Sequence, residues 1–599
     1  MTATVHAPAT AADAPHLANP DLYPSFTKGV FCGEIREDLV FPFPALDADE
    51  RESLAAILDS FHGWAAENVN SSQNDHDGKF PESVRAGMGE LGLMGLNIPE
   101  AYGGFGASSK VFSRVFGEIG ATDPALAVYF GAHQSIGCKG ITLFGTEDQK
   151  ERWLPRCASG ETVAAFCLTE PGSGSDAQAM TSVALPSADG SHYLLTGTKI
   201  WISNAGYAGV FTVFAKVPEV QADGSTKQRV TAFIVDAHAA GVSLGQPEQK
   251  MGIKASDTRT VTFDNVRVPV EDRLGKVGQG FKFALEILNS GRLGLAAGSA
   301  RGARKIMENA LAYAKQREQF GRSIGSFEMI QQKFAINAAE TYAADSAWML
   351  TAGMVDRGGI DYSLETAVCK VFASELAFRA SNDALQIAGG IGYSKEFPYE
   401  QSVRDSRINL IFEGTNEILR ALIALMALQQ PGERLKALGK AFKDPLRSLG
   451  AIGSYVAGKV QRKITHPSFS KVHEALDEEA KLVANGIHDL ALAVEDLLLK
   501  HGKDVIEHQF LQLRLANAAI DIYLATAVLS RTTWEIERAG SPEAAGAELD
   551  CAKVFIPAAM RRVRRNVRAL KVNQDSRLKA IAERALESGQ LAPNTPTDR

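Results

Sequence analysis

The hydrophobic pattern of this chain changes twice, near residue 164 and near residue 280. Up to the first change, apolar residues recur three and four positions apart, as on one face of a helix, at 51–69, 82–93 and 110–119. From 164 to 270, runs rich in Val, Thr, Phe and Ile are separated by turn signals, which is typical of short strands. After 280 the pattern is helical again. This order indicates a central antiparallel barrel or sandwich between two helical regions.

The length of 599 residues exceeds the roughly 250 to 300 at which a single core stops growing, so several domains are expected. We predict an α+β fold made of a disordered or extended tail (1–46), an N-terminal α-helical domain (47–165), a β-barrel domain (166–280), a four-helix bundle (281–430) and a helical extension (431–599). Pro431 and Gly432 mark the last boundary. Helices of the bundle are predicted at 281–289, 300–317, 327–357, 364–387 and 416–428.

Composition excludes several classes of protein. A net charge of -7 over the whole chain provides no global field for holding nucleic acid. Six scattered cysteines form no C-x-x-C pair, which predicts neither a disulfide framework nor a metal site. The first 25 residues contain no Lys or Arg, so no transit peptide is evident, and no apolar run reaches the roughly 18 residues of a membrane span. We expect a bacterial cytoplasmic protein.

Two glycine-containing segments of the β region have the composition of a cofactor site. In FCLTEPGSGSDAQAM (166–180), the glycines satisfy the dinucleotide pattern G-x-G-x-x-A, but no βαβ unit follows, so a plain turn is an equal alternative. In KIWISNAGYAG (199–209), Trp201 and Ser203 offer a wall for a planar ring. The alternative is that Trp201 fills the barrel interior.

Three segments of the bundle contain residue types suited to an active site. Arg317 lies in a glycine-rich corner and suits phosphate oxygens, although it also fits an ordinary surface position. The adjacent glycines of QIAGGIGYSKEFPYE (386–400) permit close approach of a cofactor. Glu413 follows Ile411 and Phe412, and apolar surroundings would raise its pKa, as a base acting on a weak carbon acid requires. The same loop also fits a helix cap.

Read together and in this order, these motifs resemble the acyl-CoA dehydrogenase family, particularly its very-long-chain branch. The resemblance is dense over 80–428 and weaker in the C-terminal extension. It rests on AYGGFG, GAHQSIGCKGI, FCLTEPGSGSD, KIWISN, KMGIKASDT, QREQFGR, QIAGGIGY and IFEGTNEILR. The α, β, α order agrees with the fold of that family.

The resemblance implies specific roles for the residues of these motifs. Glu413 would be the catalytic base, and the substrate would lie against Ser175, Phe412, Glu413 and Gly414. FAD would bind through Phe166, Leu168, Thr169, Gly174, Ser175, Trp201, Ile202, Ser203, Arg317, Phe320, Gln386, Gly390, Thr415, Asn416 and Glu417. Arg317, Phe320, Gln386 and Gly390 would hold the ADP half across a subunit contact, so the resemblance implies a homo-oligomer, a dimer.

The implied reaction is α,β-dehydrogenation of a long-chain fatty acyl-CoA to the trans-2-enoyl-CoA, the first step of fatty acid β-oxidation. Glu413 would remove the α-proton while the β-hydrogen leaves as hydride to FAD, and an electron-transfer flavoprotein would take the electrons. An acyl-CoA oxidase and a flavin-containing scaffold protein are the alternatives.

Two further expectations concern the substrate and the membrane. Small Ala125 and Ala127 leave room for a long acyl chain, although Tyr129 and Phe130 could shorten the space. The stretch 433–463 is basic and amphipathic, which suits either peripheral contact with an anionic membrane or a solvated helix.

Overall fold

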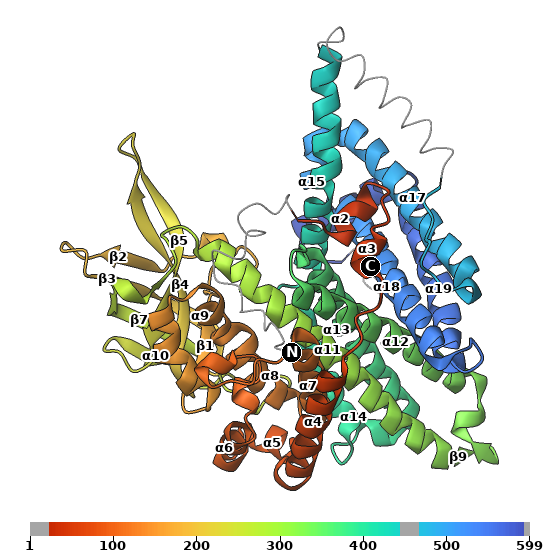
Figure 1. Cartoon of the computed structure of the whole chain (residues 1–599), viewed down its shortest axis with the longest axis horizontal. Helices are drawn as coiled ribbons and strands as arrows, with labels where there is room; N and C mark the ends of the chain where they lie inside the picture. The colour runs from red at the N-terminus through yellow and green to blue at the C-terminus, as the bar shows by residue number, and fades with distance from the viewer. Residues whose placement is uncertain (1–22, 444–465, 592–599) are drawn as a thin grey trace, which may run out of the picture.

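The computed structural model describes residues 23–443 and 466–591, and its β-sheet projects from one side of a larger helical body (Figure 1). The N-terminal helices confirm the predicted segments closely. A capping box starts the first long one, because Asp47 and Glu50 accept hydrogen bonds from each other's backbone N–H. The N-terminal helical elements are α4 (Ala48–Asn68), α5 (Ser71–Asp77), α6 (Glu82–Glu90), α7 (Ser109–Thr122), α8 (Pro124–Gly131), the π-helical turn η4 (Ala132–Gly137), α9 (Lys139–Phe144) and α10 (Glu147–Ala158).

The predicted tail is wrong for residues 23–46, whereas 1–22 lie outside the described residues. Helices α2 (Phe26–Phe31) and α3 (Glu37–Val40) occupy this segment. Phe26 is fully buried, and its ring lies 6.0 Å from that of Tyr523 in the C-terminal extension. The aromatic residues therefore pack this segment against the C-terminal extension, whereas its Pro content suggested an extended tail.

The central sheet has eight strands in the order β6-β7-β3-β2-β4-β5-β8, with β1 parallel to β4. Most pairs are antiparallel, as predicted, and β5 pairs with β4 over the whole length of β5. In the described part of the chain no pairing joins β6 to β8, so a closed barrel is not shown. The strands are β1 (Val163–Cys167), β2 (Val183–Pro186), β3 (His192–Ser203), β4 (Ala208–Val220), β5 (Thr226–Asp236), β6 (Val242–Leu244), β7 (Thr258–Pro269) and β8 (Arg273–Leu274).

One long helix runs through the centre of the molecule where the sequence predicted two. Helix α11 (Gly280–Gln316) is unbroken for 37 residues, so the predicted gap at 290–299 is wrong. Glycines in this stretch allow close packing rather than ending the helix, since a Cβ at Gly294 or Gly298 would lie about 3 Å from the Phe116 ring. The other helices of the bundle are α12 (Glu328–Arg357), α13 (Ser363–Ala388), α14 (Pro398–Arg407) and α15 (Asn416–Lys443).

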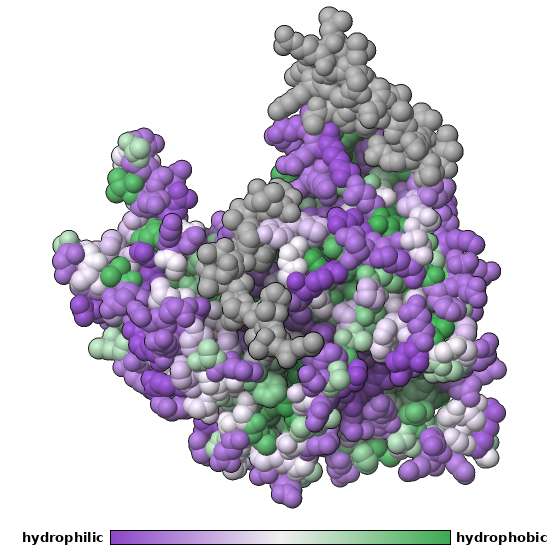
Figure 2. Space-filling model, viewed as in Figure 1, coloured by the Kyte–Doolittle hydropathy of each residue, from purple (hydrophilic) through white to green (hydrophobic). Residues whose placement is uncertain are grey.

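The C-terminal extension adds α17 (Asp477–His501), α18 (Gln509–Ala539), α19 (Gly546–Ala569) and α20 (Asp575–Ser588). Helix α18 is the one described helix long and apolar enough to cross a membrane, but 83% of its most apolar window is buried in the molecule, as expected for a core helix. The face in Figure 2 is largely hydrophilic. Helix α15 continues through Pro431, so the boundary predicted at 430 lies inside a helix. Most of the predicted membrane stretch 433–463 lies outside the described residues.

Candidate active site

Glu413 lies in a tight loop between α14 and α15. Its φ is +59° and that of Gly414 is +92°, so two consecutive residues adopt the left-handed region. This region is uncommon for a residue with a side chain and persists only where neighbouring contacts enforce it. Thr415 begins the next helix by accepting the Ile418 N–H at 3.3 Å, which confirms its predicted capping role. The loop therefore holds Glu413 in one orientation.

The Glu413 carboxylate has an unusual environment. Its Oε2 is buried and receives no hydrogen bond from any residue in the described ranges. Across from it is Gly291 of α11, where an added Cβ would lie 2.7 Å from that oxygen. A buried carboxylate oxygen without a partner is costly, so it is usually retained for function. The arrangement leaves the carboxylate free to accept a proton from a bound molecule.

Two buried cations hold the backbone of this loop. Arg292 Nε donates to the Glu413 carbonyl at 3.2 Å, and Lys370 Nζ donates to the Gly414 carbonyl at 2.9 Å. Lys370 Nζ also donates to Asn416 Oδ1 at 2.8 Å. The first two of these hydrogen bonds go to backbone carbonyls of the loop and not to the Glu413 carboxylate. Their hydrogen bonds therefore position the loop, while their charges act on the carboxylate through space.

Burial raises the pKa of Glu413 to about 7, and the charges of Arg292 and Lys370 limit that rise. Burial also lowers the pKa of Lys370 to about 7 and that of Arg292 to about 10. Glu413 and Lys370 titrate over the same range and interact, so their apparent pKa values belong to the pair. A carboxylate with a pKa near neutrality is a stronger base than a solvated one, which suits removal of a proton from carbon.

Replacing Gly291 with alanine is expected to lower the turnover number about 100-fold, because the new methyl group would displace the Glu413 carboxylate from its position. Helix α11 should persist, since alanine is the better helix former. Steady-state kinetics with circular dichroism would test this. Gly63→Ala, at an exposed glycine of α4 outside the site, is the control, because nothing lies within 4 Å of a Cβ there. Equal activity of both variants would show that the close approach is unimportant.

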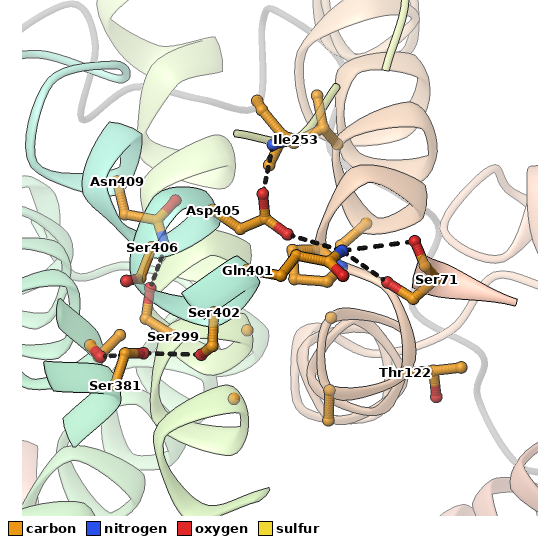
Figure 3. Close-up of a pocket in the computed structure, with 18 of the residues that line it drawn as sticks. Ser71, Thr122, Ile253, Ser299, Ser381, Gln401, Ser402, Asp405, Ser406 and Asn409 are labelled. Atoms are coloured by element: carbon orange, nitrogen blue, oxygen red, sulfur yellow. Dashed lines mark hydrogen bonds between the residues drawn. The ribbon is translucent and has the colours of Figure 1, made fainter. Parts of the chain in front are cut away.

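Glu413 lies at one end of a cavity of about 460 Å³ that follows α11. The cavity is lined by one side of α11, from Gly291 to Asn309. At the helical rise of about 1.5 Å per residue, this stretch is about 27 Å long. Figure 3 shows a polar part of this cavity, with side chains from α14 and neighbouring helices around it. Of the residues predicted to set chain length, Ala127 lines the cavity, whereas Tyr129 and Phe130 are among other aromatic rings. The cavity is long enough for an extended acyl chain.

The predicted flavin-binding segments lie side by side on the β domain. The Ile200 N–H donates to the Thr169 carbonyl at 3.0 Å, and Ser203, at the end of β3, lines the same cavity as Glu413. Trp201 has a φ of +56° and is 63% exposed, and nothing lies within 4 Å of a Cβ at Gly174. An exposed indole next to an open glycine loop fits a planar cofactor. Phe166 and Leu168 belong to the adjoining strand segment, and Ser175 is exposed on the glycine loop.

Two predicted cofactor residues have side chains placed elsewhere. Ile202 is buried in the hydrophobic core of the β domain, so only its backbone can face a ligand. The Asn416 amide is also buried, where it donates to Ser374 at 3.1 Å and to Glu375 at 3.2 Å. Its side chain supports the loop instead of contacting a cofactor. Glu417, in the first turn of α15, is exposed.

Arg317, Phe320, Gln386 and Gly390 are all exposed. The hairpin at 318–323, which contains Phe320, projects on the opposite side of the molecule from the sheet (Figure 1). Phe320 is 93% exposed with a φ of +53°. Within one chain this hairpin therefore forms no common site with the β domain.

Sequence reasoning missed three residues of this site, namely Gly291, Arg292 and Lys370. All three lie on long helices, and each reaches Glu413 or its loop from more than 40 positions away. The one usable signal was polar: a lysine and an arginine each stand within otherwise apolar, small-residue stretches of helix.

Comparison with known proteins agrees with this geometry. The acyl-CoA dehydrogenase N-terminal, middle and C-terminal domain families match residues 51–161, 165–266 and 278–428, and the ACAD9/ACADV C-terminal domain family matches 474–591. The very long-chain specific acyl-CoA dehydrogenase, mitochondrial, of Bos taurus is 41% identical over 584 residues, which cover 96% of this chain and 89% of the bovine one. A probable acyl-CoA dehydrogenase of Bacillus subtilis is 36% identical over 488 residues, or 78% of each chain.

A solved structure extends the agreement to the fold. The acyl-CoA dehydrogenase from Bacillus anthracis, complexed with FAD, superimposes with a TM-score of 0.78 at 31% identity and covers 95% of both chains. Family matches span the helical, sheet and bundle regions and the C-terminal extension. This chain therefore belongs to the acyl-CoA dehydrogenase family, the flavin-dependent oxidoreductases that bind FAD.

Proposed function

We propose that this protein catalyses the FAD-dependent α,β-dehydrogenation of long-chain fatty acyl-CoA to trans-2-enoyl-CoA, the first step of fatty acid β-oxidation. The unpartnered Glu413 carboxylate at the end of a cavity about 27 Å long is the observation that carries the proposal. Such a cavity is longer than the roughly 15 Å that one acyl chain spans in half of a bilayer's hydrocarbon core, so it accommodates a chain of membrane-lipid length. The very long-chain specificity in the name of the bovine relative points the same way.

Glu413 acts as the base in this reaction. Ionised, it removes the α-proton of the thioester. FAD, when bound, would supply the acceptor for the β-hydrogen and its electron pair. The Glu413 backbone N–H donates to no acceptor in the described ranges, so it is free to bind the thioester carbonyl as negative charge develops there. Phe412 and Gly414 flank the acyl group, and Arg292 and Lys370 keep the loop in place.

FAD is proposed to bind against Phe166, Leu168, Thr169, Gly174, Ser175, Trp201 and Ser203 of one chain, near Thr415 and Glu417. Its ADP half would meet Arg317, Phe320, Gln386 and Gly390 of a second copy. The hairpin that begins with β9 lies far from the sheet in Figure 1 and contains the exposed Phe320, which supports this division of the site. We therefore propose a homodimer, with an electron-transfer flavoprotein as the acceptor of the electrons.

Anaerobic addition of palmitoyl-CoA to the purified FAD-loaded protein tests the function directly. We expect the visible absorbance of the oxidised flavin to be lost, and product analysis to give the trans-2-enoyl-CoA. A protein that holds FAD but is not reduced by acyl-CoA of any chain length would refute the proposed activity and favour a binding role for the fold.

The length of the cavity predicts a position that controls chain length. Gly302 lines it between Glu413 and the far end, and nothing lies within 4 Å of a Cβ there, so a larger side chain would fill open space. Gly302→Leu is expected to lower kcat/KM for palmitoyl-CoA at least about tenfold and to leave butyryl-CoA unaffected. Gly63→Leu, at an exposed glycine of α4, controls for the helix substitution. Parallel losses for both substrates would contradict this position for the chain.

A further inference from the structure

The cavity that begins at Glu413 changes character along its length. Near the carboxylate its walls are apolar, with Phe116, Leu295 and Phe412 among them. Farther away, α14 and the turn after it contribute polar side chains from Asn409 back to Gln401, a distance of about 12 Å along the helix. Figure 3 shows these groups lying between α14 and its neighbours. A cavity that takes only hydrocarbon needs no polar groups there.

The polar groups form hydrogen-bonded pairs between helices. Asn409 Nδ2 donates to Ser299 Oγ of α11 at 3.3 Å, and the hydroxyls of Ser402 and Ser381 are 2.8 Å apart. On α14, Gln401 Nε2 donates to Asp405 Oδ2 at 3.2 Å. These bonds satisfy part of the hydrogen-bonding capacity of the wall. They also fix the direction in which the remaining donors and acceptors point.

Unused capacity remains on the cavity side. No residue in the described part of the chain donates to Gln401 Oε1 or Asn409 Oδ1, and both side chains are half-buried cavity-lining groups. Ser381 donates its proton to the Ala377 carbonyl at 2.8 Å, so Ser402 is the donor of the pair and retains free lone pairs. Asn409 also has a second N–H. The wall therefore offers acceptors together with a donor.

A hydrocarbon chain that displaces water from such a wall leaves these groups without partners, which is unfavourable. A hydroxyl group on the chain supplies a donor and an acceptor at once. A carboxylate there is less suited, because Asp405 presents its own carboxyl group to the same wall. We propose that the preferred substrates are long-chain acyl-CoAs with a hydroxyl group in the distal part of the chain. The inference rests on the proposed dehydrogenase function and names its substrate class.

The test compares palmitoyl-CoA with omega-hydroxypalmitoyl-CoA and with a stearoyl-CoA hydroxylated in mid-chain. The FAD-loaded enzyme is expected to show at least a fivefold higher kcat/KM for one of the hydroxylated substrates than for palmitoyl-CoA. Two variants remove both partners of a bond at once, which leaves no orphaned group: Ser299→Ala with Asn409→Leu, and Ser381→Ala with Ser402→Ala. Either is expected to reverse the preference. Ser346→Ala, a buried α12 serine that bonds the Tyr342 carbonyl, is the control.

The outcomes separate this inference from the function on which it rests. Equal kcat/KM for palmitoyl-CoA and both hydroxylated substrates, or a preference unchanged in both double variants, overturns the inference and leaves the dehydrogenase intact. Failure of all three substrates to reduce the flavin overturns the proposed function, and the inference with it. Calorimetric Kd values with Glu413→Gln, in which no turnover occurs, should repeat the preference and its reversal. If one double variant fails to fold, the other still decides.

Discussion

Glu413→Gln is expected to abolish dehydrogenation while leaving the fold and the bound cofactor intact. Glutamine has the shape of glutamate but cannot accept the α-proton, and a positioned general base contributes roughly 100-fold to 10,000-fold to a rate. The Glu413 oxygen near Gly291 has no hydrogen-bond partner to lose. Anaerobic stopped-flow reduction of the flavin by palmitoyl-CoA would measure the loss, with FAD content and Tm as controls.

The same substitution has a defined effect on stability. Burial raises the pKa of Glu413 in the folded protein to about 7 from its ordinary value of 4.5. A carboxyl group whose folded pKa is raised destabilises the protein progressively as pH rises from the unfolded value through the folded one. The neutral glutamine avoids this cost, so the Tm of the variant above neutral pH should not fall below that of the native enzyme. Substantial flavin reduction by Glu413→Gln would show that another group removes the proton.

The overall order of the domains could be predicted from local pattern, because a period of about 3.6 and a period of 2 leave different traces in sequence. Apolar spacing at 51–69 located α4 to within a few residues. The apparent break in α11 was an error of the same reasoning, since glycine weakens a helix by local propensity but here makes room for the Phe116 ring. Residues 26–43 were mistaken for tail because their helices are short and their stability comes from contact with α18.

Glu413 could be singled out because it follows Ile411 and Phe412 in a segment that resembles a motif of the family. Its partners could not, since Gly291, Arg292 and Lys370 reach it only through the packing of α11 and α13 beside the loop. Local pattern reports which face of a helix is apolar but not which loop lies against that face. The cavity could not be predicted either, because it is formed by several helices whose relative positions no local pattern specifies.

Lys370→Met is expected to lower kcat/KM about 100-fold and to move the rising limb of its pH profile to higher pH. The limb arises because Glu413 must be ionised to accept a proton, so activity increases as pH rises through the apparent pKa near 7. The Lys370 charge lowers the pKa of Glu413, and its loss should raise that pKa further. Methionine fills a similar volume but cannot donate to Gly414 or Asn416.

The two effects of Lys370 can be separated. Leaving the Gly414 carbonyl without a donor costs about 1 to 3 kcal/mol, and Asn416 Oδ1 keeps only Ser374 Oγ at 3.4 Å. The loop is loosened, which lowers the rate at every pH. Lys370→Arg keeps the charge but changes the geometry, so its limb should stay near that of the native enzyme while its rate falls. Lys28→Met, which breaks a buried ion pair with Asp361 at 2.8 Å, should reduce Tm without moving the limb. A Lys370→Met profile that falls uniformly, with an unmoved limb, would assign to this lysine a purely positioning role.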